Sequence, residues 1–422
     1  MASRFPGIPQ NNAADTIAAP ITPPGFGAIQ VIRISGPGVR SLAHALCRRS
    51  AAILRAPRSQ VLTEFGEHGS TLDTALVTFF PAPASYTGDD VLEIALHGSP
   101  FLLQETLRLL REHGVRGAEA GEFTRRAFFN GKLDLSQAEA VADIVAAESE
   151  AQARVAREQL AGRLSDALAS VGEPLRDALA EVEAFIDFPD EDIEPETSAG
   201  WLDRIDRVKE AMHGLLLTYR AGKMFREGAA VCLAGVPNAG KSSLLNRLLG
   251  EERAIVTDIP GTTRDSIEER INLNGLLVRL WDTAGLFTAS AARLPDAVER
   301  LGVERSWRRL AEADLVLYVF DGATSPVDEY ALIEQVCQAS KAVLGVANKS
   351  DKSIAPRPAD FPLRDVVAVS AKTGAGVDAL LERVTAALLT DQPPREAVVV
   401  TSERHRDCLE RASEALTRAR EA

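Results

Sequence analysis

The sequence predicts a multidomain protein: a small α+β domain, then an α-helical domain into which an α/β domain with a parallel sheet is inserted. The chain has 422 residues, more than one hydrophobic core usually serves. Short apolar runs between glycines and prolines come first, long alanine-rich helical periodicity follows, and apolar runs alternating with helical patterns come after it. The expected domains are the α+β domain 1–130, the two helical parts 131–222 and 391–422, and the inserted α/β domain 223–390.

The first domain is predicted from its apolar runs. Ala28–Ile34, Ala75–Phe80 and Val91–Leu96 have the composition of strands, and Phe101–Glu112 has the spacing of an amphipathic helix. Several strands and a helix within about 130 residues are typical of one compact α+β domain.

From Leu133 the pattern becomes helical. Apolar residues recur at spacings of three and four, which makes one stripe along a helix and predicts packing in a helical bundle. The stripe consists of Leu160, Leu164, Leu168, Val171, Leu175, Leu179, Val182 and Ile186. Pro174 lies inside it and is expected to kink or restart the helix, because proline lacks a backbone N–H. Trp201–Tyr219 predicts another helix, Asp391–Pro394 a linker, and Ser402–Arg420 a last helix.

The α/β segment begins with a phosphate-binding loop. Gly235–Ser242 has the sequence Gly-Val-Pro-Asn-Ala-Gly-Lys-Ser, after the apolar run Ala229–Ala234 and before the helical pattern Ser242–Leu249. A glycine-rich loop between a strand and a helix lets backbone N–H groups and the helix N-terminus surround a phosphate. In such a loop Lys241 reaches the β- and γ-phosphates, and the hydroxyl of Ser242 ligates Mg²⁺.

Three further motifs stand at the ends of predicted strands. They are Asp282–Gly285 after Leu277–Trp281, Asn348–Asp351 after Val343–Ala347, and Ser370–Lys372 after Val366–Val369. The Asp351 carboxylate can accept hydrogen bonds from N1–H and the exocyclic amine of guanine, whereas adenine has neither donor there. Because all these motifs follow strands, they predict a guanine nucleotide and a P-loop GTPase domain of the Ras-like type.

A threonine-rich segment, Thr257–Asp265, lies between the phosphate loop and Asp282. We interpret it as a switch that orders around the γ-phosphate, with Thr263 as a second Mg²⁺ ligand beside Ser242. The residues predicted to bind GTP are Asn238, Ala239, Gly240, Lys241, Ser242, Ser243, Thr257, Asp258, Ile259, Pro260, Gly261, Thr262, Thr263, Asp282, Thr283, Ala284, Gly285, Asn348, Lys349, Asp351, Ser370, Ala371 and Lys372.

The chain resembles the MnmE (TrmE) family of bacterial tRNA-modification GTPases. The resemblance rests on Asn238 in the loop, the Gly-Thr-Thr-Arg-Asp run at 261–265, and the N-terminal motifs Tyr86–Glu93 and Gly121–Phe128. It implies a bound K⁺ that supplies the positive charge an arginine finger brings in other GTPases. By motif position the K⁺ shell would be Asn238, Thr257, Ile259 and Thr262; without the resemblance, Asn238 is simply a turn residue that tolerates left-handed geometry.

The resemblance also implies a folate-binding-like, dimer-forming N-terminal domain. Formyl-tetrahydrofolate would contact Arg33, Glu93 and Lys132; without the resemblance, Arg33 and Lys132 are ordinary surface charges. The implied reaction installs an aminomethyl-type group at C5 of the wobble uridine of tRNA, while K⁺-dependent GTP hydrolysis rearranges the GTPase domains. The implied assembly is a homodimer in a heterotetramer with an FAD-dependent partner of the MnmG (GidA) type.

Three departures from the family pattern limit what the resemblance implies. Thr288 stands where the family has the glutamate that positions the attacking water, so no catalytic residue is assigned. Phe26 replaces a usual arginine. The family's terminal Cys-x-Gly-Lys has no counterpart before Ala422, and Cys408 stands in no such motif. This predicts a truncated sequence or an impaired modification function, and the alternative is a degenerate guanine-nucleotide-binding scaffold with little hydrolysis. A ribosome-assembly GTPase is a third interpretation, but it leaves the first 130 residues unexplained.

The composition of the chain indicates its cellular compartment and limits how much of its surface could bind RNA. The four cysteines have no metal-ligand spacing, and neither a signal segment nor a membrane-length apolar run is present, which predicts a cytoplasmic protein. The net charge of −13 excludes a chain coated with nucleic acid, so a tRNA contact would be a local patch. The candidates are Arg108, Arg111, Arg116, Arg125 and Arg126, and a solvated helix face is the alternative.

Overall fold

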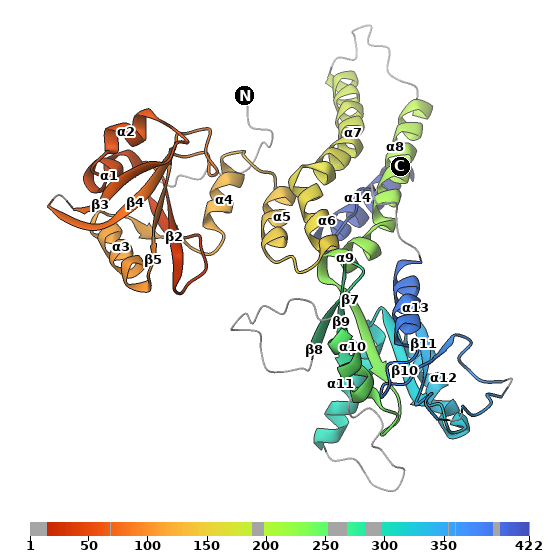
Figure 1. Cartoon of the computed structure of the whole chain (residues 1–422). Coiled ribbons are helices and arrows are strands. Elements are labelled where there is room, and N and C mark those ends of the chain that lie inside the picture. The colour runs from red at the N-terminus through yellow and green to blue at the C-terminus, as the bar shows by residue number, and fades with distance from the viewer. Residues whose placement is uncertain are drawn as a thin grey trace. The chain divides into compact units, whose positions relative to one another are not determined.

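The computed structural model describes residues 15–67, 69–187, 198–251, 268–282, 297–352, 354–358, 360–390 and 397–421. The chain forms two compact units, Met1–Val141 and Ala142–Ala422 (Figure 1). Helix α5 (Leu135–Val145) spans the boundary between them in the sequence. The four-part division predicted from the sequence stays a prediction at its boundaries.

The first unit contains a six-stranded sheet with the order β3-β4-β5-β2-β1-β6. Neighbouring strands are antiparallel except for the parallel pair β1–β6. The strands are β1 (Ile17–Pro20), β2 (Gly27–Ser35), β3 (Val61–Glu67), β4 (Ser70–Phe80), β5 (Val91–Gly98) and β6 (Arg116–Gly117). Strands β2, β4 and β5 and helix α3 (Pro100–Glu112) confirm the predicted elements. Helices α1 (Val39–Leu46) and α2 (Ser50–Arg55) share one apolar core with α3 and the sheet.

A buried ion-pair network holds α4 (Glu122–Phe129) in this unit. The Arg126 side chain is 0% exposed, and its Nη2 donates to Asp15 at 2.8 Å and to Glu122 at 3.2 Å. Arg116 also donates to Glu122, at 2.7 Å. The predicted basic patch is therefore wrong for Arg126, because a buried and paired guanidinium cannot meet RNA. Two other candidates are paired with carboxylates as well, Arg108 with Glu105 and Arg125 with Glu119.

Acid is expected to destabilise this network through Glu122. The hydrogen bond from Arg116 lowers the pKa of Glu122 from its ordinary 4.5 to about 2. Because the folded-state pKa is lowered, the stabilisation is fully present above pH 4.5 and is lost as the pH falls from 4.5 towards 2, with a magnitude of about 3 kcal/mol. Calorimetric unfolding of the full chain across this pH range should show it. Glu122→Gln should flatten the acid dependence, whereas Glu105→Gln, at an exposed ion pair, should leave it unchanged; equal profiles for the two variants would contradict the prediction.

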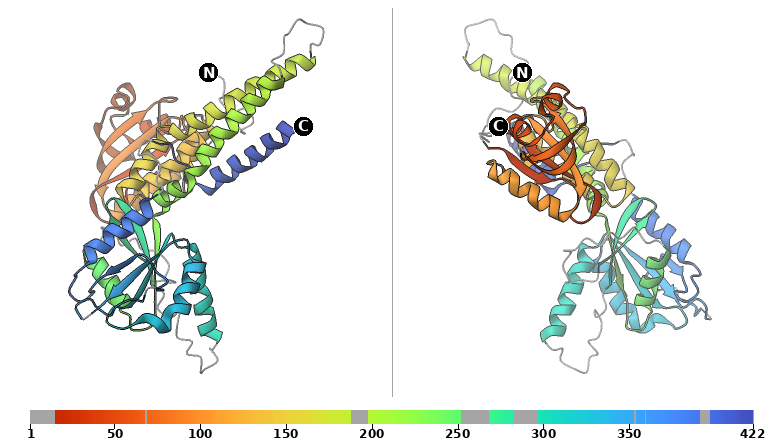
Figure 2. Two further views of the ribbon diagram at one scale, coloured as in Figure 1. Left: turned by 90° about the vertical axis from the view of Figure 1, so that its right-hand side faces the viewer. Right: turned by 60° about the vertical axis from the view of Figure 1, so that its left-hand side comes forward.

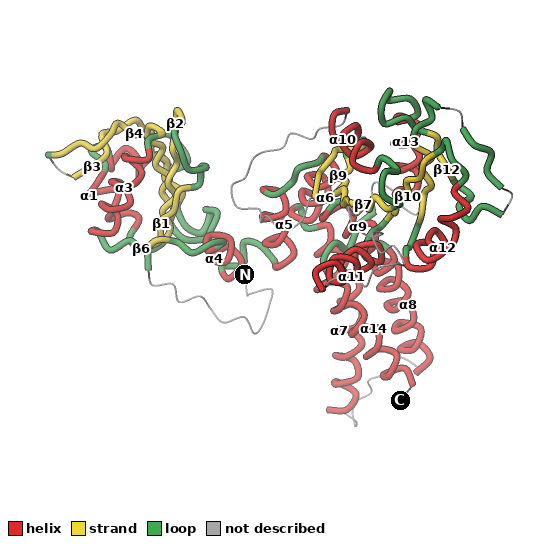
Figure 3. The backbone as a smooth tube through the Cα atoms, turned by 90° about the horizontal axis from the view of Figure 1, so that it is seen from below, coloured by secondary structure: helices red, strands yellow, loops and turns green. Residues whose placement is uncertain are grey.

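The helical part of the second unit is built from α6 (Glu150–Leu160), α7 (Arg163–Asp187), α8 (Ser198–Leu217), α9 (Tyr219–Glu227) and α14 (Glu403–Glu421). Figures 2 and 3 show α7, α8 and α14 lying together, and α8 contacts both of the others. Their shared core includes Leu164, Val171, Met212 and Leu409. Since α14 follows the α/β part and returns to α8, the α/β part lies between two segments of one helical bundle.

Helix α7 runs unbroken through Pro174, so the expectation of a restarted helix is wrong. Val171 is buried before the proline and Leu175 packs against the same core after it, so tertiary contacts on both sides outweigh the cost of about 3 kcal/mol for an internal proline. The predicted apolar stripe is packed only along the first part of α7. Leu179 is 57% and Ile186 is 67% exposed.

The α/β part has a six-stranded sheet with the order β12-β11-β10-β7-β9-β8. All neighbours are parallel except β8–β9. The elements are β7 (Ala229–Ala234), β8 (Glu268–Leu273), β9 (Leu276–Asp282), β10 (Leu315–Asp321), β11 (Val343–Asn348) and β12 (Val366–Ala368), with helices α10 (Lys241–Glu251), α11 (Ala297–Glu312), α12 (Tyr330–Ala339) and α13 (Val377–Leu389). This confirms the predicted α/β class.

Helices cover both faces of this sheet. Val231 and Leu233 of β7 pack into one core with residues of α10 and α13, whereas Cys232 and Ala234 pack into a second core with residues of α11 and α12. The sheet is therefore the middle of three layers, and its strands are apolar on both faces. Cys232 is buried in the sheet, and this burial raises the pKa of its thiol to about 12, as for a small buried hydrophobe.

Strands β8 and β9 form a hairpin that contacts the helical part. Its turn, Asn274–Gly275, has positive φ at both residues (51° and 85°), as asparagine–glycine hairpin turns do. The N–H of Ala151, in the first turn of α6, donates to the Gly275 carbonyl at 3.1 Å. Arg270 of β8 pairs with Glu148, just before α6.

Candidate nucleotide-binding site

The phosphate loop connects the end of β7 to the start of α10. Gly235 and Gly240 have φ values of 139° and 93°, which side-chain-bearing residues rarely adopt. A Cβ on Gly235 would clash with the Val319 carbonyl of β10, and one on Gly240 would clash with the Asn348 amide. Both glycines are therefore required by the close approach of neighbouring segments. Asn238, between them, is exposed and has a left-handed backbone with φ 64°.

The side chain of Lys241, near the end of the phosphate loop, lies back over that loop. Its Nζ donates to the carbonyl oxygens of Gly235 at 2.8 Å and Val236 at 2.9 Å. Partial burial lowers the pKa of Lys241, and the nearby carboxylates of Asp282 and Glu329 oppose that shift. These two bonds hold the ammonium group at the loop, where the motif predicts that it binds the phosphates.

Ser242 and Asp282 meet at the carboxyl end of the sheet. The Ser242 hydroxyl lies 3.4 Å from Asp282 Oδ2, which is long for a hydrogen bond. Asp282 Oδ1 is buried and has no partner among the described residues. A hydroxyl and an incompletely satisfied carboxylate are ligands that Mg²⁺ prefers, so the donor set fits this ion.

Asn348 connects the phosphate loop to Ser370–Lys372, the predicted guanine loop. Its buried side-chain amide donates to the Ala239 carbonyl at 2.9 Å, and its Oδ1 accepts from the N–H groups of Lys349 at 2.8 Å and Ala371 at 3.1 Å. Asn348 therefore holds three segments in place, which its motif alone did not reveal.

The Asp351 carboxylate, which is predicted to read guanine, accepts a hydrogen bond from Ser370. The Ser370 hydroxyl donates to Asp351 Oδ1 at 2.7 Å, and this bond is the main cause of a lowered pKa of the exposed Asp351 carboxyl. Lys349 has φ 65° and pairs with Asp321 at 2.7 Å. Asp321 was not predicted, although its place at the end of a parallel strand is a signal that could have identified it.

The rest of the predicted site divides into two groups. Ser243 and Lys372 are exposed beside the loops described above, and Ala239 is buried. The other predicted positions lie outside the described residues: Thr257, Asp258, Ile259, Pro260, Gly261, Thr262, Thr263, Thr283, Ala284, Gly285 and the expected carboxylate position Thr288.

The predicted folate residues are only partly brought together. Arg33 of β2 lies opposite Glu93 of β5, and its Nε donates to Glu93 Oε1 at 2.9 Å. The Arg33 guanidinium lies 5.0 Å from the ring centre of Tyr86 and 5.7 Å from that of Phe123. Lys132 is exposed; its backbone N–H donates to the Ala127 carbonyl, and no described contact joins its side chain to this pair.

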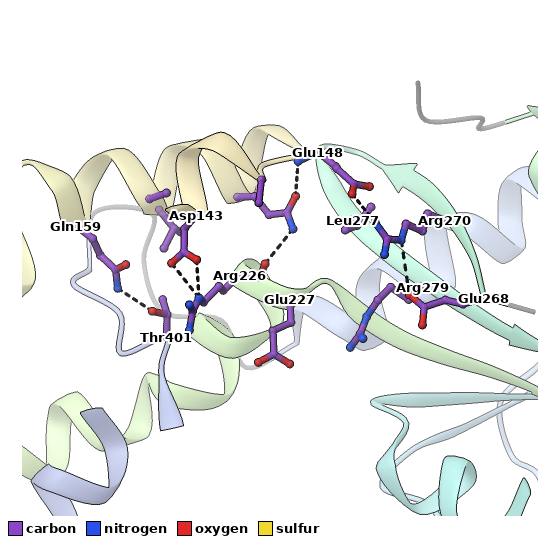
Figure 4. Close-up of a pocket in the computed structure, with 14 residues that line it drawn as sticks. Asp143, Glu148, Gln159, Arg226, Glu227, Glu268, Arg270, Leu277, Arg279 and Thr401 are labelled. Atoms are coloured by element: carbon purple, nitrogen blue, oxygen red, sulfur yellow. Dashed lines mark hydrogen bonds and ion pairs between the residues drawn. The ribbon is translucent and has the colours of Figure 1, made fainter. Parts of the chain in front are cut away.

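A cavity of about 340 Å³ lies in the second unit between α6, α9 and the β8–β9 hairpin (Figure 4). Figure 4 shows Arg226 directed at Asp143, 2.9 Å away, and Arg270 directed at Glu148. Gln152 adds a bond to the Arg226 carbonyl at 2.9 Å. Most charged side chains at this junction are paired with an opposite charge. Their contacts hold the helical part against the sheet. No motif in the sequence indicates this junction. Separately, none of the described helices is long and apolar enough to cross a membrane.

Two family models match the chain. The MnmE helical domain matches residues 135–422, and the N-terminus of the GTP-binding protein TrmE matches residues 16–132. The tRNA modification GTPase MnmE of Azoarcus sp. (strain BH72) is 42% identical over 100% of this chain and 91% of its own length. The chain belongs to the MnmE family. The MnmE protein of Aquifex aeolicus (strain VF5) is 41% identical over 96% of this chain and 89% of its own length.

The predicted resemblance to MnmE is thus confirmed over nearly the whole chain. Among solved structures, the G domain of the T. maritima FeoB iron transporter is 28% identical, with a TM-score of 0.28, and covers 38% of this chain and 98% of that one. The assignment of the MnmE α/β part as a GTPase domain rests instead on its own strand order and motifs.

Proposed function

We propose that this MnmE-family chain hydrolyses GTP in its α/β part and acts in the modification of tRNA. The observation that carries the proposal is the convergence of the phosphate loop, Asp282 and the Asp351–Ser370 pair at the carboxyl ends of parallel strands. The relatives that match the chain over most of their length are named tRNA modification GTPases.

Each described residue has a specific task in this proposal. The loop N–H groups and Lys241 bind the phosphates, Ser242 and Asp282 hold Mg²⁺ with Thr263, and Asp351 reads the guanine ring. Mg²⁺ neutralises charge on the β- and γ-phosphates. Asn348 keeps the phosphate and guanine loops at a constant separation, because it bonds to both.

We also propose a K⁺ site at the phosphate loop. Asn238, with Thr257, Ile259 and Thr262, would hold K⁺ beside the phosphates. The support is that Asn238 is exposed at the loop. Its left-handed backbone, with φ 64°, also fits an ordinary turn residue. A monovalent cation there adds positive charge where the transition state becomes more negative.

In the N-terminal unit we propose a formyl-tetrahydrofolate site at Arg33 and Glu93, with Lys132 at its edge. The support is the chemistry of the pair: a carboxylate for pterin N–H donors, a guanidinium for carboxylates, and the rings of Tyr86 and Phe123 beside them. The chain would act as a homodimer with an MnmG-type flavoprotein, on C5 of the wobble uridine. The four predicted domains would divide these tasks.

Hydrolysis by the purified full chain is expected to depend on K⁺. At equal ionic strength, steady-state GTP turnover should be at least about 10-fold faster in KCl than in NaCl, since a positive charge at the phosphates is worth up to about 10³–10⁵ in related enzymes. Asn238→Ala should remove the K⁺ stimulation while GDP binding persists. The exposed Asn130→Ala substitution in the other unit is the control. No turnover in either salt, with GDP still bound, would overturn the hydrolysis proposal and leave the nucleotide-binding scaffold.

The tRNA role needs a separate measurement. The chain should be expressed in a bacterium that lacks its own MnmE protein, and nucleosides from its tRNA should be analysed by mass spectrometry. We expect the aminomethyl-type uridine to return with the natural chain and not with Lys241→Ala. Active GTP hydrolysis without any return of the nucleoside would contradict the modification role.

A further inference from the structure

Arg247 extends from the phosphate-binding helix to the guanine loop. It lies in α10, which begins at Lys241, and its side chain is half-buried. Its Nε donates to the Ala371 carbonyl at 3.2 Å, and its Nη2 donates to the Lys372 carbonyl at 2.8 Å. These contacts join segments that are more than 120 residues apart in the sequence. A guanidinium stays charged and offers donors in a planar fork, so one side chain can hold two successive carbonyls.

The Ala371 peptide units are constrained from two sides. The Ala371 N–H is bonded to Asn348 Oδ1, so this group is already engaged. The Ala371 carbonyl is engaged by Arg247. A trans peptide unit is planar, and its C=O and the following N–H point in opposite directions. Holding the Ala371 carbonyl towards α10 therefore turns the Lys372 N–H away from α10, on the side of the loop opposite Arg247.

In the same loop, Ser370 lies beside Asp351, the group predicted to bind N1–H and the amine of guanine. Ser370 bonds to Asp351, whose carboxylate matches N1–H and the amine of guanine. Guanine carries O6 next to N1, so an N–H donor beside Asp351 would complete its recognition. The Lys372 N–H is the donor whose direction Arg247 controls.

We propose that Arg247 is a positioning residue for guanine recognition: from the helix that follows the phosphate loop, it sets the peptide orientation that presents the Lys372 N–H to O6. The inference rests on the proposed nucleotide site and deepens it. Arg247 does not touch the base itself; it acts through the loop.

Binding of two nucleotides to the full chain tests this role. GDP has O6 and N1–H, whereas the diphosphate of 2-aminopurine riboside keeps the exocyclic amine and lacks both, so each variant is compared with the natural chain for the same nucleotide. Arg247→Ala is expected to weaken GDP binding about 10-fold and to leave the affinity for the 2-aminopurine analogue within about twofold, so that the preference for O6 falls. Arg247→Lys should give an intermediate loss, because an ammonium group cannot hold both carbonyls in the same fork. Arg383→Ala, which removes an exposed, ion-paired arginine of α13, is the control.

The binding results distinguish a positioning role of Arg247 from a purely structural one. Equal losses for the two nucleotides in both Arg247 variants would show that Arg247 merely supports the fold and would overturn the inference, as would unchanged GDP binding. If Arg247→Ala does not fold, the Arg247→Lys comparison decides alone. Failure of the natural chain to bind GDP would instead overturn the proposed function, and this result is distinct from the others.

Discussion

Substitution of Asp351 by asparagine is expected to weaken GDP binding by roughly 10³-fold and to create affinity for xanthosine diphosphate. A site built for hydrogen bonds rejects a mismatched partner by about 10⁴–10⁵, and the loss here is smaller because the amide oxygen still accepts one bond. Xanthine has an acceptor oxygen where guanine has its amine, so the new amide N–H can pair with it. The Ser370 hydroxyl can still donate to the amide oxygen, as it does to the carboxylate at 2.7 Å.

Equilibrium titration with both diphosphates checks this exchange of specificity. Asp365→Asn is the matched control, because Asp365 pairs with Arg383 at an exposed site. Retention of full GDP affinity by Asp351→Asn would mean that the base is read elsewhere.

The second large effect is expected at Lys241. Lys241→Ala should reduce GTP turnover about 10²–10³-fold, the usual loss when one preorganised electrostatic group of a transition state is removed. The ammonium group is already held over the loop by the Gly235 and Val236 carbonyls, so little reorganisation is needed when the phosphates bind.

Single-turnover hydrolysis separates this loss from weaker binding. Lys341→Ala is the control, since Lys341 makes exposed contacts with Glu312 and Asp314 in the same α/β part. Turnover by Lys241→Ala above about one tenth of the natural rate would place the phosphates away from this loop.

Strands that are buried on both faces of a sheet could be predicted from the sequence. Strand β7 was predicted at its observed bounds, because a central parallel strand is apolar on both faces. Edge strand β8 was not predicted: its sequence begins Glu-Glu-Arg and has only two buried positions. Of the kink or restart expected at Pro174, the restart was wrong, because tertiary packing, invisible in the local sequence, supports α7 on both sides of the proline.

Among the site residues, those in contiguous motifs could be predicted, and those defined by long-range contacts could not. Lys241 and Asp351 belong to contiguous motifs, so their neighbours in the sequence identify them. Arg247 and the double role of Asn348 depend on contacts across more than 100 residues, and no local pattern indicates them. Arg126 was misassigned to a surface patch, because the sequence does not show the carboxylates that bury it.

The hairpin of β8 and β9 extends from the proposed nucleotide site to the helical bundle. One end carries Asp282, and the turn at the other end rests on the first turn of α6 through Gly275. A strand of six or seven residues spans about 20 Å, and a paired ribbon is stiff over that length. A displacement of Asp282, the proposed Mg²⁺ ligand, would therefore reach α6 through this hairpin. The helical bundle would then respond to a change at the proposed nucleotide site without contacting the nucleotide.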